Sequence, residues 1–339
     1  MLATEIYQGS GLGNQLFFYV TTRCIALDKG LDFGTITPEY FANNMHSDCG
    51  LYFMDIDPGI VTDGRGMPVY NEKEVRYYVG NSAHDMQHGA YITGCDEGLW
   101  EVGDGTVLCG NLQDEKYFIR HREEIKTWLK VKPEYDCYEY SDPDLCILHL
   151  RCSDYMSSPE LFLRRKFWVR GMKCMKKHNP DMRFMIITND VEAAGRLLPG
   201  IPAYNFDLAK DYSIIKNARN LLLSNSSFTL FPVFTSDVEQ YIIAPKYWAR
   251  HNVSDGYWAS EQNIYTGFNY MDRKGRLFTA EECREELEAF KKKAKYARHI
   301  RPLHGLPLLG AWFRSKLILL RFWTGRALRS LKRRLGITK

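Results

Sequence analysis

The chain lacks several signatures that would place it in familiar classes of protein. Its nine cysteines include no Cys-x-x-Cys pair, a pattern that favours reduced, mostly buried thiols over a disulfide framework or a zinc site. Residues 1–5 form neither a basic nor an apolar segment, so we expect no signal peptide and no N-terminal anchor. Internal repeats and low-complexity segments are also absent. We therefore expect a globular protein of the cytoplasm.

Acidic residues are missing from residues 301–339, which hold ten Lys or Arg. The whole chain carries +4, so the remainder carries 4 − 10 = −6. Charge confined to one tail argues against a nucleic-acid-binding protein, whose basic residues would spread over the fold.

Within this tail, large apolar residues recur at helical spacing over 312–335, with Trp312 and Trp323 among them. Arginines interrupt the apolar runs, so the segment should not span a bilayer. An amphipathic, acid-free helix of this kind is typical of one that lies on an anionic membrane surface. The alternative is a helix packed on the protein with a solvated basic face. The first interpretation predicts a peripheral protein on the inner face of the membrane.

Length and composition indicate more than one domain. A chain of 339 residues exceeds one ordinary core. Apolar content of 45% and charged content of 25% are those of soluble globular proteins, and 14% aromatic residues suit the stacking of bases or sugars. We predict an N-terminal Rossmann-like domain on the acceptor side at 1–140, a nucleotide-sugar-binding domain at 141–278, a charged helix at 279–300 and a membrane-associating tail at 301–339.

Strands alternate with helices from residue 140 onward, which predicts an α/β protein with a parallel sheet. Apolar strands are predicted at 145–150, 183–188, 202–206, 220–224 and 239–243. Helices are predicted near 160–178, near 191–198, from about 211, from about 228, and from a capping box at Thr279 to about residue 298.

The first half begins with a strand, a glycine turn (residues 9–15, GSGLGNQ) and an amphipathic helix that ends at Gly30. Such a turn lets backbone approach a ligand, and a helix N-terminus favours an anion; a tight packing turn is the alternative. A dinucleotide-binding fingerprint fits poorly, because Asn14 stands where the third glycine belongs. Residues 36–110 predict loops and short elements, followed by a strand at 107–110 and a helix at 117–130.

Two polar stretches follow apolar strands in the second half: residues 149–155 (HLRCSDY) and residues 224–228 (SNSSF). Ligands of open α/β sheets bind at strand ends. The guanidinium of Arg151 matches phosphate oxygens two at a time, and small hydroxyl and amide side chains bind phosphate without charge. Together they predict a site for the diphosphate of a nucleotide sugar.

Four segments, in order, resemble glycosyltransferase family 11, the α-1,2-fucosyltransferases. They are residues 11–17 (GLGNQLF), 110–118 (GNLQDEKYF), 149–155 (HLRCSDY), and 225–229 (NSSFT) with 243–248 (IAPKYW). The resemblance implies a GT-B fold with two Rossmann-like domains facing a cleft. It further implies GDP-fucose as donor, inversion at the anomeric carbon, and no metal or cofactor. The implied acceptor is a hydroxyl of an oligosaccharide or lipid-linked glycan, such as the 2-OH of galactose, in surface-polysaccharide assembly.

Roles follow from this resemblance. Arg151 should bind the β-phosphate and stabilise the charge that develops as GDP leaves. Ser226 and Ser227 should donate to the same diphosphate, with Asn225 shaping the turn; helix capping is the alternative for either serine. The remaining candidate residues of the nucleotide-sugar site are His149, Phe228, Gly11, Gly13, Asn14, Gln15 and Asp211.

Several of these assignments leave alternatives open. His149 either bonds the guanine or ribose or is a core partner. Asp211 either reads the guanine edge, as in related α-1,6-fucosyltransferases, or caps its helix. Asp154 is the main candidate for the general base, but it could instead orient Arg151; Glu160 is a further candidate.

Two departures from the family pattern stand out. Cys152 and Ser153 replace Arg and Gly, which removes a positive charge from the expected phosphate pocket, and Leu230 and Phe231 replace two tryptophans. They leave open another donor or linkage on the same fold. They also leave open a catalytically inactive protein that binds a nucleotide or glycan at the membrane.

Overall fold

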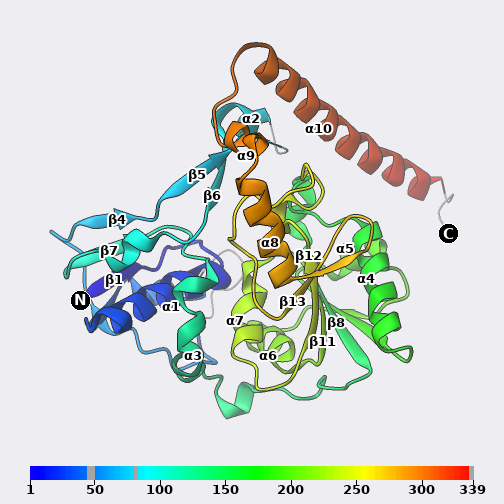
Figure 1. Cartoon of the computed structure of the whole chain (residues 1–339). Coiled ribbons are helices and arrows are strands. Elements are labelled where there is room, and N and C mark those ends of the chain that lie inside the picture. The colour runs from blue at the N-terminus through cyan, green and yellow to red at the C-terminus, as the bar shows by residue number, and fades with distance from the viewer. Residues whose placement is uncertain (44–49, 80–82, 336–339) are drawn as a thin grey trace.

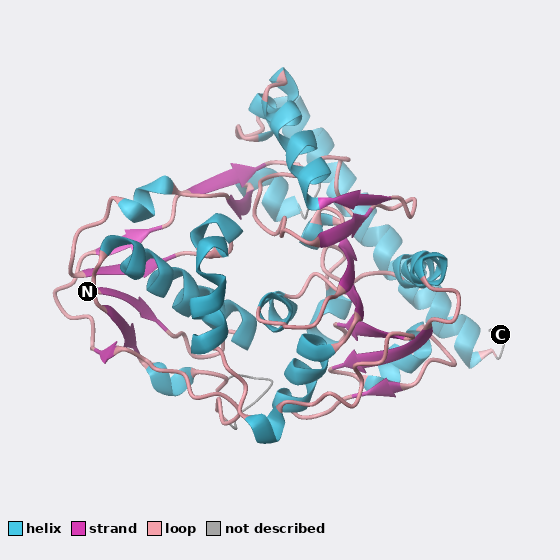
Figure 2. Cartoon of the chain, turned by 60° about the horizontal axis from the view of Figure 1, so that its bottom comes forward, coloured by secondary structure: helices cyan, strands magenta, loops and turns pink. Residues whose placement is uncertain are grey.

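The computed structural model describes residues 1–43, 50–79 and 83–335. Two sheets organise the chain, one in each half, and each is flanked by helices (Figures 1 and 2). The predicted fold class, two Rossmann-like α/β domains that face one another, is confirmed.

The first half is built on a five-stranded sheet in the order β3-β2-β1-β7-β4, with every pair parallel. Its strands are β1 (Leu2–Glu5), β2 (Phe33–Ile36), β3 (Ile60–Val61), β4 (Val69–Asn71) and β7 (Thr106–Cys109). An antiparallel ribbon of β5 (Glu74–Tyr77) and β6 (Ala90–Thr93) encloses helix α2 (Ala83–His88). The other helices are α1 (Leu12–Lys29) and α3 (Arg122–Trp128).

The second half holds a seven-stranded sheet in the order β10-β9-β8-β11-β12-β13-β14, parallel except for the last pair. Its strands are β8 (Leu145–Leu150), β9 (Arg183–Thr188), β10 (Ala203–Tyr204), β11 (Asn220–Leu223), β12 (Tyr241–Pro245), β13 (Phe268–Met271) and β14 (Leu277–Thr279). Its helices are α4 (Arg165–His178), α5 (Val191–Leu197), α6 (Leu208–Asn217), α7 (Leu230–Phe234), α8 (Ala280–Lys291) and α9 (Ala294–His299). Apart from His149 and Asn220, strands β8 and β11 consist of apolar residues, because both faces of these strands are covered.

Most predicted elements are confirmed, among them the loops and short elements of residues 36–110, and two need correction. The helix predicted at 117–130 is a series of short 3-10 turns before α3, because Tyr117 and Phe118 are adjacent and both fully buried. The capping box at Thr279 is confirmed, but its helix ends at Lys291 and the extended backbone of Lys293 separates it from α9. Residues 36–110, predicted as loops and short elements, contain strands too short for a periodic signal.

The two halves share apolar packing. The ring centroids of Phe17 on α1 and Phe231 on α7 are 5.0 Å apart, and Phe118 lies 5.7 Å from Phe231. Phe231 is fully buried here, at one of the positions where the family resemblance expects tryptophan. A substantial apolar contact of this kind opposes free rotation of one half against the other.

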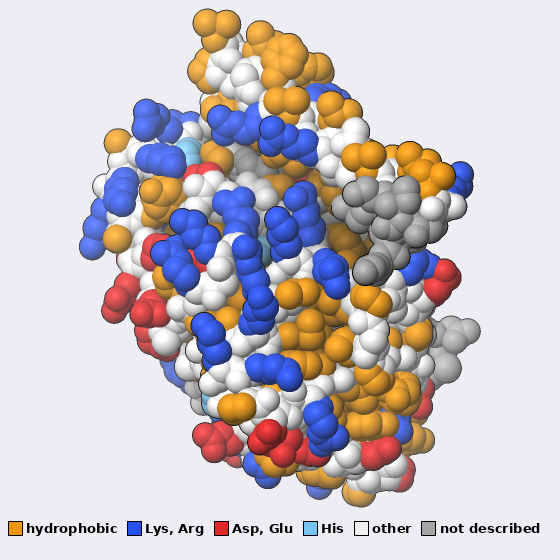
Figure 3. All heavy atoms as spheres, turned by 90° about the vertical axis from the view of Figure 1, so that its right-hand side faces the viewer, with side chains coloured by type: hydrophobic (Ala, Val, Ile, Leu, Met, Phe, Trp, Pro, Cys, Tyr) orange, Lys and Arg blue, Asp and Glu red, His pale blue; other side chains and the backbone are white. Residues whose placement is uncertain are grey.

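Helix α10 (Gly305–Arg334) follows the second half and extends along its outer side (Figure 1). Figure 3 views this side of the molecule and shows Lys and Arg side chains gathered across it, with Asp and Glu mainly at the margins. No helix in the described ranges combines the length and the apolar character that crossing a bilayer requires.

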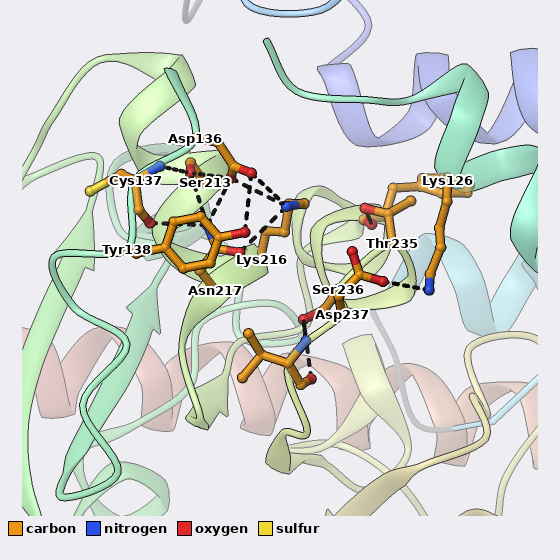
Figure 4. Close-up of polar contacts among 12 residues, drawn as sticks. Lys126, Asp136, Cys137, Tyr138, Ser213, Lys216, Asn217, Thr235, Ser236 and Asp237 are labelled. Carbon is orange, nitrogen blue, oxygen red and sulfur yellow. Dashed lines mark hydrogen bonds and ion pairs between the residues drawn. The ribbon is translucent and has the colours of Figure 1, made fainter. Parts of the chain in front are cut away.

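The linker between the halves is held by Asp136 (Figure 4). Its carboxylate accepts hydrogen bonds from Ser213 Oγ at 3.1 Å and Asn217 Nδ2 at 2.7 Å, and it forms an ion pair with Lys216 Nζ at 3.0 Å. All three partners lie on α6 and are buried. The linker is thereby attached to the helix that also carries Asp211.

Replacing Asp136 with alanine should destabilise the protein by about 3 kcal/mol, because the ammonium of Lys216 would stay buried without its carboxylate. Chemical denaturation measures the loss. Glu139→Ala, which removes an exposed partner of Lys210, is the control and should leave the unfolding midpoint unchanged. A wild-type midpoint in Asp136→Ala would contradict the assignment.

Candidate functional site

The predicted phosphate-binding stretches meet at one edge of the second sheet. Strands β8 and β11 are neighbours, with Leu223 opposite His149, so Arg151 and Ser226 follow adjacent strand ends. The order of the strands reverses here: β9 and β10 lie on the β8 side, and β12 lies on the β11 side. Such a reversal leaves a crevice at the carboxyl ends of the strands, where ligands of doubly wound sheets bind.

The glycine turn of the first half lies directly against this crevice. A Cβ atom on Gly13 would be 2.4 Å from both the backbone N of Phe228 and the backbone C of Ser227. No side chain could be accommodated there unless the backbone moved. Glycine at position 13 therefore allows the start of α1 to contact the turn at residues 226–228 of the other half, which we call the serine turn.

Replacing Gly13 with alanine should force the two halves apart and destabilise the protein by about 1–3 kcal/mol, the usual cost of overpacking. Thermal unfolding measures the change. Gly11→Ala is the matched control for stability, because no atom lies within 4 Å of the added Cβ. Equal melting temperatures for the two variants would show that the contact at Gly13 is dispensable.

A cavity of about 580 Å³ occupies the crevice between the halves, and we call it the arginine cavity. Most of the predicted site residues line it: Gly11, Gly13, Asn14, His149, Arg151, Asp154, Asp211, Ser226, Ser227 and Phe228. They come from the two sheets, so the site is complete only when both halves are in place.

Arg151 is oriented by a carboxylate three residues away. Its Nε lies 3.2 Å from Asp154 Oδ1 and its Nη2 lies 3.4 Å from Oδ2, so the two groups are paired side by side. The guanidinium also lies over the Tyr155 ring, 5.6 Å from the centroid. This is the geometry expected if Asp154 orients Arg151, the alternative to its role as a base.

His149 adds no charge to the cavity at neutral pH. Burial, and secondarily the charge of Arg151, lower the pKa of its imidazole to about 3. Its Nδ1 lies 3.1 Å from Ser224 Oγ, and its ring lies against Phe228 with centroids 5.8 Å apart. The ring is thus a neutral, largely buried wall of the cavity.

Asp211 does not cap its helix. The N-cap of α6 is Asp207, whose side chain accepts from the backbone N of Lys210. The Oδ1 of Asp211 is buried without a hydrogen-bond partner in the structure, and burial raises the pKa of this carboxyl to about 8. A buried acceptor on the cavity wall is suited to an N–H donor of a ligand.

In the serine turn, the capping alternative applies to Ser226, and both serines line a cavity. Ser226 caps a 3-10 helix (Ser227–Thr229), since its Oγ accepts from the backbone N of Phe228 at 3.4 Å, and it also lines the arginine cavity. Ser227 has no such capping bond in the described contacts and lines two cavities. Either hydroxyl can also donate to an anion.

A second cavity of about 430 Å³ adjoins the first, and we call it the amide cavity. The two share three lining residues, Asn14, Tyr155 and Ser227. The amide cavity is lined on one side by Asn111 and Gln113 of the first half. Other polar and aromatic residues that line it include Tyr91, Glu160, Asn225, Trp248, Gln262 and Asn263.

Two predicted site residues belong to the amide cavity alone. The carboxylate of Glu160 accepts from Ser158 Oγ at 2.8 Å and faces this cavity. Asn225 is 3% exposed, and neither its Oδ1 nor its Nδ2 has a partner in the structure. A buried amide with no partner on a cavity wall indicates a position for a polar ligand.

Two expectations need correction. Gln15 lines neither cavity: its side chain is fully buried and bonds backbone groups of Tyr7, Tyr40 and Ala42, which is a structural role. The side chain of Cys152 is also fully buried, in the core behind β8. Loss of an arginine at this position therefore takes no charge from the cavity.

Ser153, the other departure, adopts a φ of +36°, in the left-handed region that favours glycine. The resembled motif has glycine at this position, which adopts this backbone conformation freely. Serine adopts it only at a cost in conformational energy.

Sequence reasoning missed several lining residues. Tyr155 separates the cavities, and Asn189, at the end of β9, accepts from the backbone N of Cys152 at 2.9 Å. Gln113 Nε2 donates to Asn14 Oδ1 at 3.1 Å, which links two of the motifs. The signal was available for Tyr155 and Gln113, since both belong to the matched segments; Asn189 follows a predicted strand end.

Comparisons with known proteins give structural matches alone. No family model and no curated protein matches the chain. Twenty-five solved chains match. Fucosyltransferase NodZ from Bradyrhizobium is 12% identical, with 69% of this chain and 93% of that chain covered and a TM-score of 0.38.

POFUT1 in complex with GDP-fucose is 10% identical, with coverage of 70% and 95% and a TM-score of 0.40. A putative UDP-N-acetylglucosamine 2-epimerase from Listeria monocytogenes is 12% identical, with coverage of 100% and 97% and a TM-score of 0.37. The resemblance to glycosyltransferase family 11 stays a prediction.

Proposed function

We propose that this protein is an inverting, metal-independent glycosyltransferase that transfers L-fucose from GDP-fucose to a sugar hydroxyl. The observation that carries the proposal is the pair of adjoining cavities. One has an arginine at a strand end beside a glycine turn and a serine turn, and the other has walls rich in amides and aromatic rings. A donor and an acceptor that occupied them would meet beside Tyr155.

The arginine cavity fits the nucleotide part of the donor. Arg151 presents a planar guanidinium with paired N–H donors to the diphosphate. Ser226 and Ser227 add hydroxyl donors from the adjacent strand end. Asp211 offers a carboxylate to N1 and N2 of guanine, which uracil and adenine cannot match in the same way. These contacts together select a guanosine diphosphate.

The amide cavity fits the acceptor. Sugar hydroxyls both donate and accept, as amides do, so the unpartnered Asn225 suits a hydroxyl of the acceptor. Tyr91 and Trp248 provide aromatic surface for the sugar ring. From the family resemblance we propose the 2-OH of a hexose such as galactose, in a surface-polysaccharide or lipid-linked glycan.

In the transfer step, the acceptor oxygen forms a bond to the anomeric carbon while the bond from that carbon to the phosphate oxygen breaks. GDP leaves with the electron pair, and the acceptor proton passes to a base. Arg151 stabilises the negative charge that develops on the β-phosphate. We assign Glu160, which lines the amide cavity, as the base that accepts this proton. We assign Asp154 the role of orienting Arg151.

A panel of radiolabelled nucleotide sugars tests the donor. With galactosides as acceptors, GDP-fucose should give a labelled disaccharide, while GDP-mannose and UDP-sugars should not. Selective turnover of a UDP-sugar would overturn the donor assignment. Tight GDP binding without any turnover across a broad acceptor panel would instead support an inactive binding protein.

A further inference from the structure

The side of the molecule that carries α4 and α10 has an unusual distribution of charge (Figure 3). Residues 161–180 contain seven Lys or Arg and no Asp or Glu. Helix α4 buries Phe167, Trp168 and Met175 against the sheet and leaves its cationic side exposed. Its exposed cations are Arg164, Arg165, Lys166, Lys173, Lys176 and Lys177. A second cationic element, remote in sequence, therefore stands beside the basic tail.

Among its described side chains, helix α10 buries residues on one side. It packs against α2, buries Ser315 and Phe322, and donates from Arg326 Nη1 to the backbone O of Met156 at 3.2 Å. The large apolar side chains on the remaining surface are exposed by 41–82%: Leu306, Leu309, Trp312, Phe313, Leu317, Leu320, Trp323, Leu328, Leu331 and Leu335.

At about 100° per residue, these apolar positions fall on one side of α10, opposite Ser315 and Phe322. Arg314 and Arg321 lie at one margin of this apolar stripe, and Lys316 and Arg334 lie within it, between the positions of Trp323 and Leu309. All four cations are exposed. An apolar stripe that points to solvent, with cations beside it and within it, is the arrangement of a helix that lies in a membrane interface.

We infer that α4 and α10 form one docking surface for an anionic lipid bilayer. Exposed apolar side chains of α10 enter the interface, while the exposed cations of α4 and α10 face lipid phosphates. The absence of acidic residues from both segments matches the negative charge of such a bilayer. The contact of Arg326 with Met156 fixes α10 beside the turn that carries Asp154 and Tyr155, so docking holds the cleft close to the lipid.

Cosedimentation of the full-length protein with vesicles tests this surface. The wild-type protein should pellet with vesicles that contain phosphatidylglycerol and stay in solution with phosphatidylcholine alone, and added salt should release it. Retention in solution with both kinds of vesicle would overturn the inference.

Two variants test the two helices separately. Reversal of three α4 charges (Lys173→Glu, Lys176→Glu, Lys177→Glu) should weaken partitioning by at least about 100-fold. The matched control reverses three exposed cations elsewhere (Arg65→Glu, Lys130→Glu, Arg219→Glu) and should bind as wild type. If the α4 variant pelleted like this control, α4 would not belong to the surface.

The apolar stripe is tested with Phe313→Ser, Leu317→Ser and Leu320→Ser, which should weaken partitioning by at least about tenfold. The control replaces exposed valines elsewhere, Val61, Val69 and Val191, with serine.

Light scattering without vesicles tests whether a second copy of the chain, rather than a membrane, covers the apolar stripe. A wild-type dimer that the stripe variant turns into a monomer would overturn membrane docking. Transfer to a soluble acceptor should be unaffected, so the result is independent of the proposed enzymatic activity.

Discussion

Replacing Arg151 with alanine is expected to lower kcat for fucosyl transfer by about 10²–10³-fold, the usual effect of removing one preorganised group that stabilises developing charge. The guanidinium lies at the carboxyl end of β8 in the arginine cavity, held by Asp154. Arg151→Lys should recover only part of the rate, because an ammonium keeps the charge but not the fork. Initial rates at saturating donor measure both effects.

Arg219→Ala is the matched control for this series. Arg219 is exposed and directly precedes β11, at the opposite end of the strand from the serine turn. Its removal should leave kcat unchanged. If Arg151→Ala kept the wild-type rate, the phosphate role would be wrong, and with it the placement of the donor in the arginine cavity.

The affinity for GDP should rise with pH up to about 8 because of Asp211. Burial raises the pKa of this carboxyl to about 8 in the free protein, so it is protonated at neutral pH. The N1–H and 2-amino groups of guanine donate to Asp211 and so favour its ionised form. Binding of GDP therefore releases a proton from Asp211. The dissociation constant should fall by up to about tenfold per pH unit below pH 8 and level off above it. Calorimetric titrations between pH 6 and pH 9 measure this slope.

Asp211→Asn removes the titrating group and supplies the control for this slope. Its affinity should be weaker at pH 8, by about 10–100-fold, because bonds to a charged acceptor are lost. It should retain only the pH dependence that the phosphates of GDP themselves cause. Inosine diphosphate, which lacks the 2-amino group, should bind wild type more weakly than GDP but the variant about equally. If Asp211→Asn kept the wild-type pH dependence of GDP affinity, Asp211 would not be the group that recognises guanine.

The second half was more predictable than the first because its central strands are longer and buried on both faces. Strands β8 and β9 have six residues each and are mainly apolar, and their position fixes where Arg151 and Asn189 begin the polar loops. In the first half, β3 has two residues and β4 has three, so their local sequences carry no usable period. These strands are defined by their neighbours in the sheet rather than by their own pattern.

Motif residues were predictable as a group but not one by one. Gln15 and Gly13 belong to the same glycine turn, yet one supports the backbone from inside and the other permits the contact between the halves. Asn225 and Ser226 are adjacent but line different cavities. Successive residues in a turn point in different directions, and sequence spacing does not say which direction leads to the ligand.

By itself, the sequence determined the alternation of strands and helices, the polar groups at the ends of β8 and β11, and the basic, apolar character of the tail. Local apolar periodicity and charge are properties of short segments, so they can be read without a fold. Only the tertiary structure decided that the two cavities adjoin at Tyr155, that Cys152 lies in the core, and that α4 stands beside α10. Each of these depends on how segments far apart in the chain are arranged in space, which local sequence does not determine.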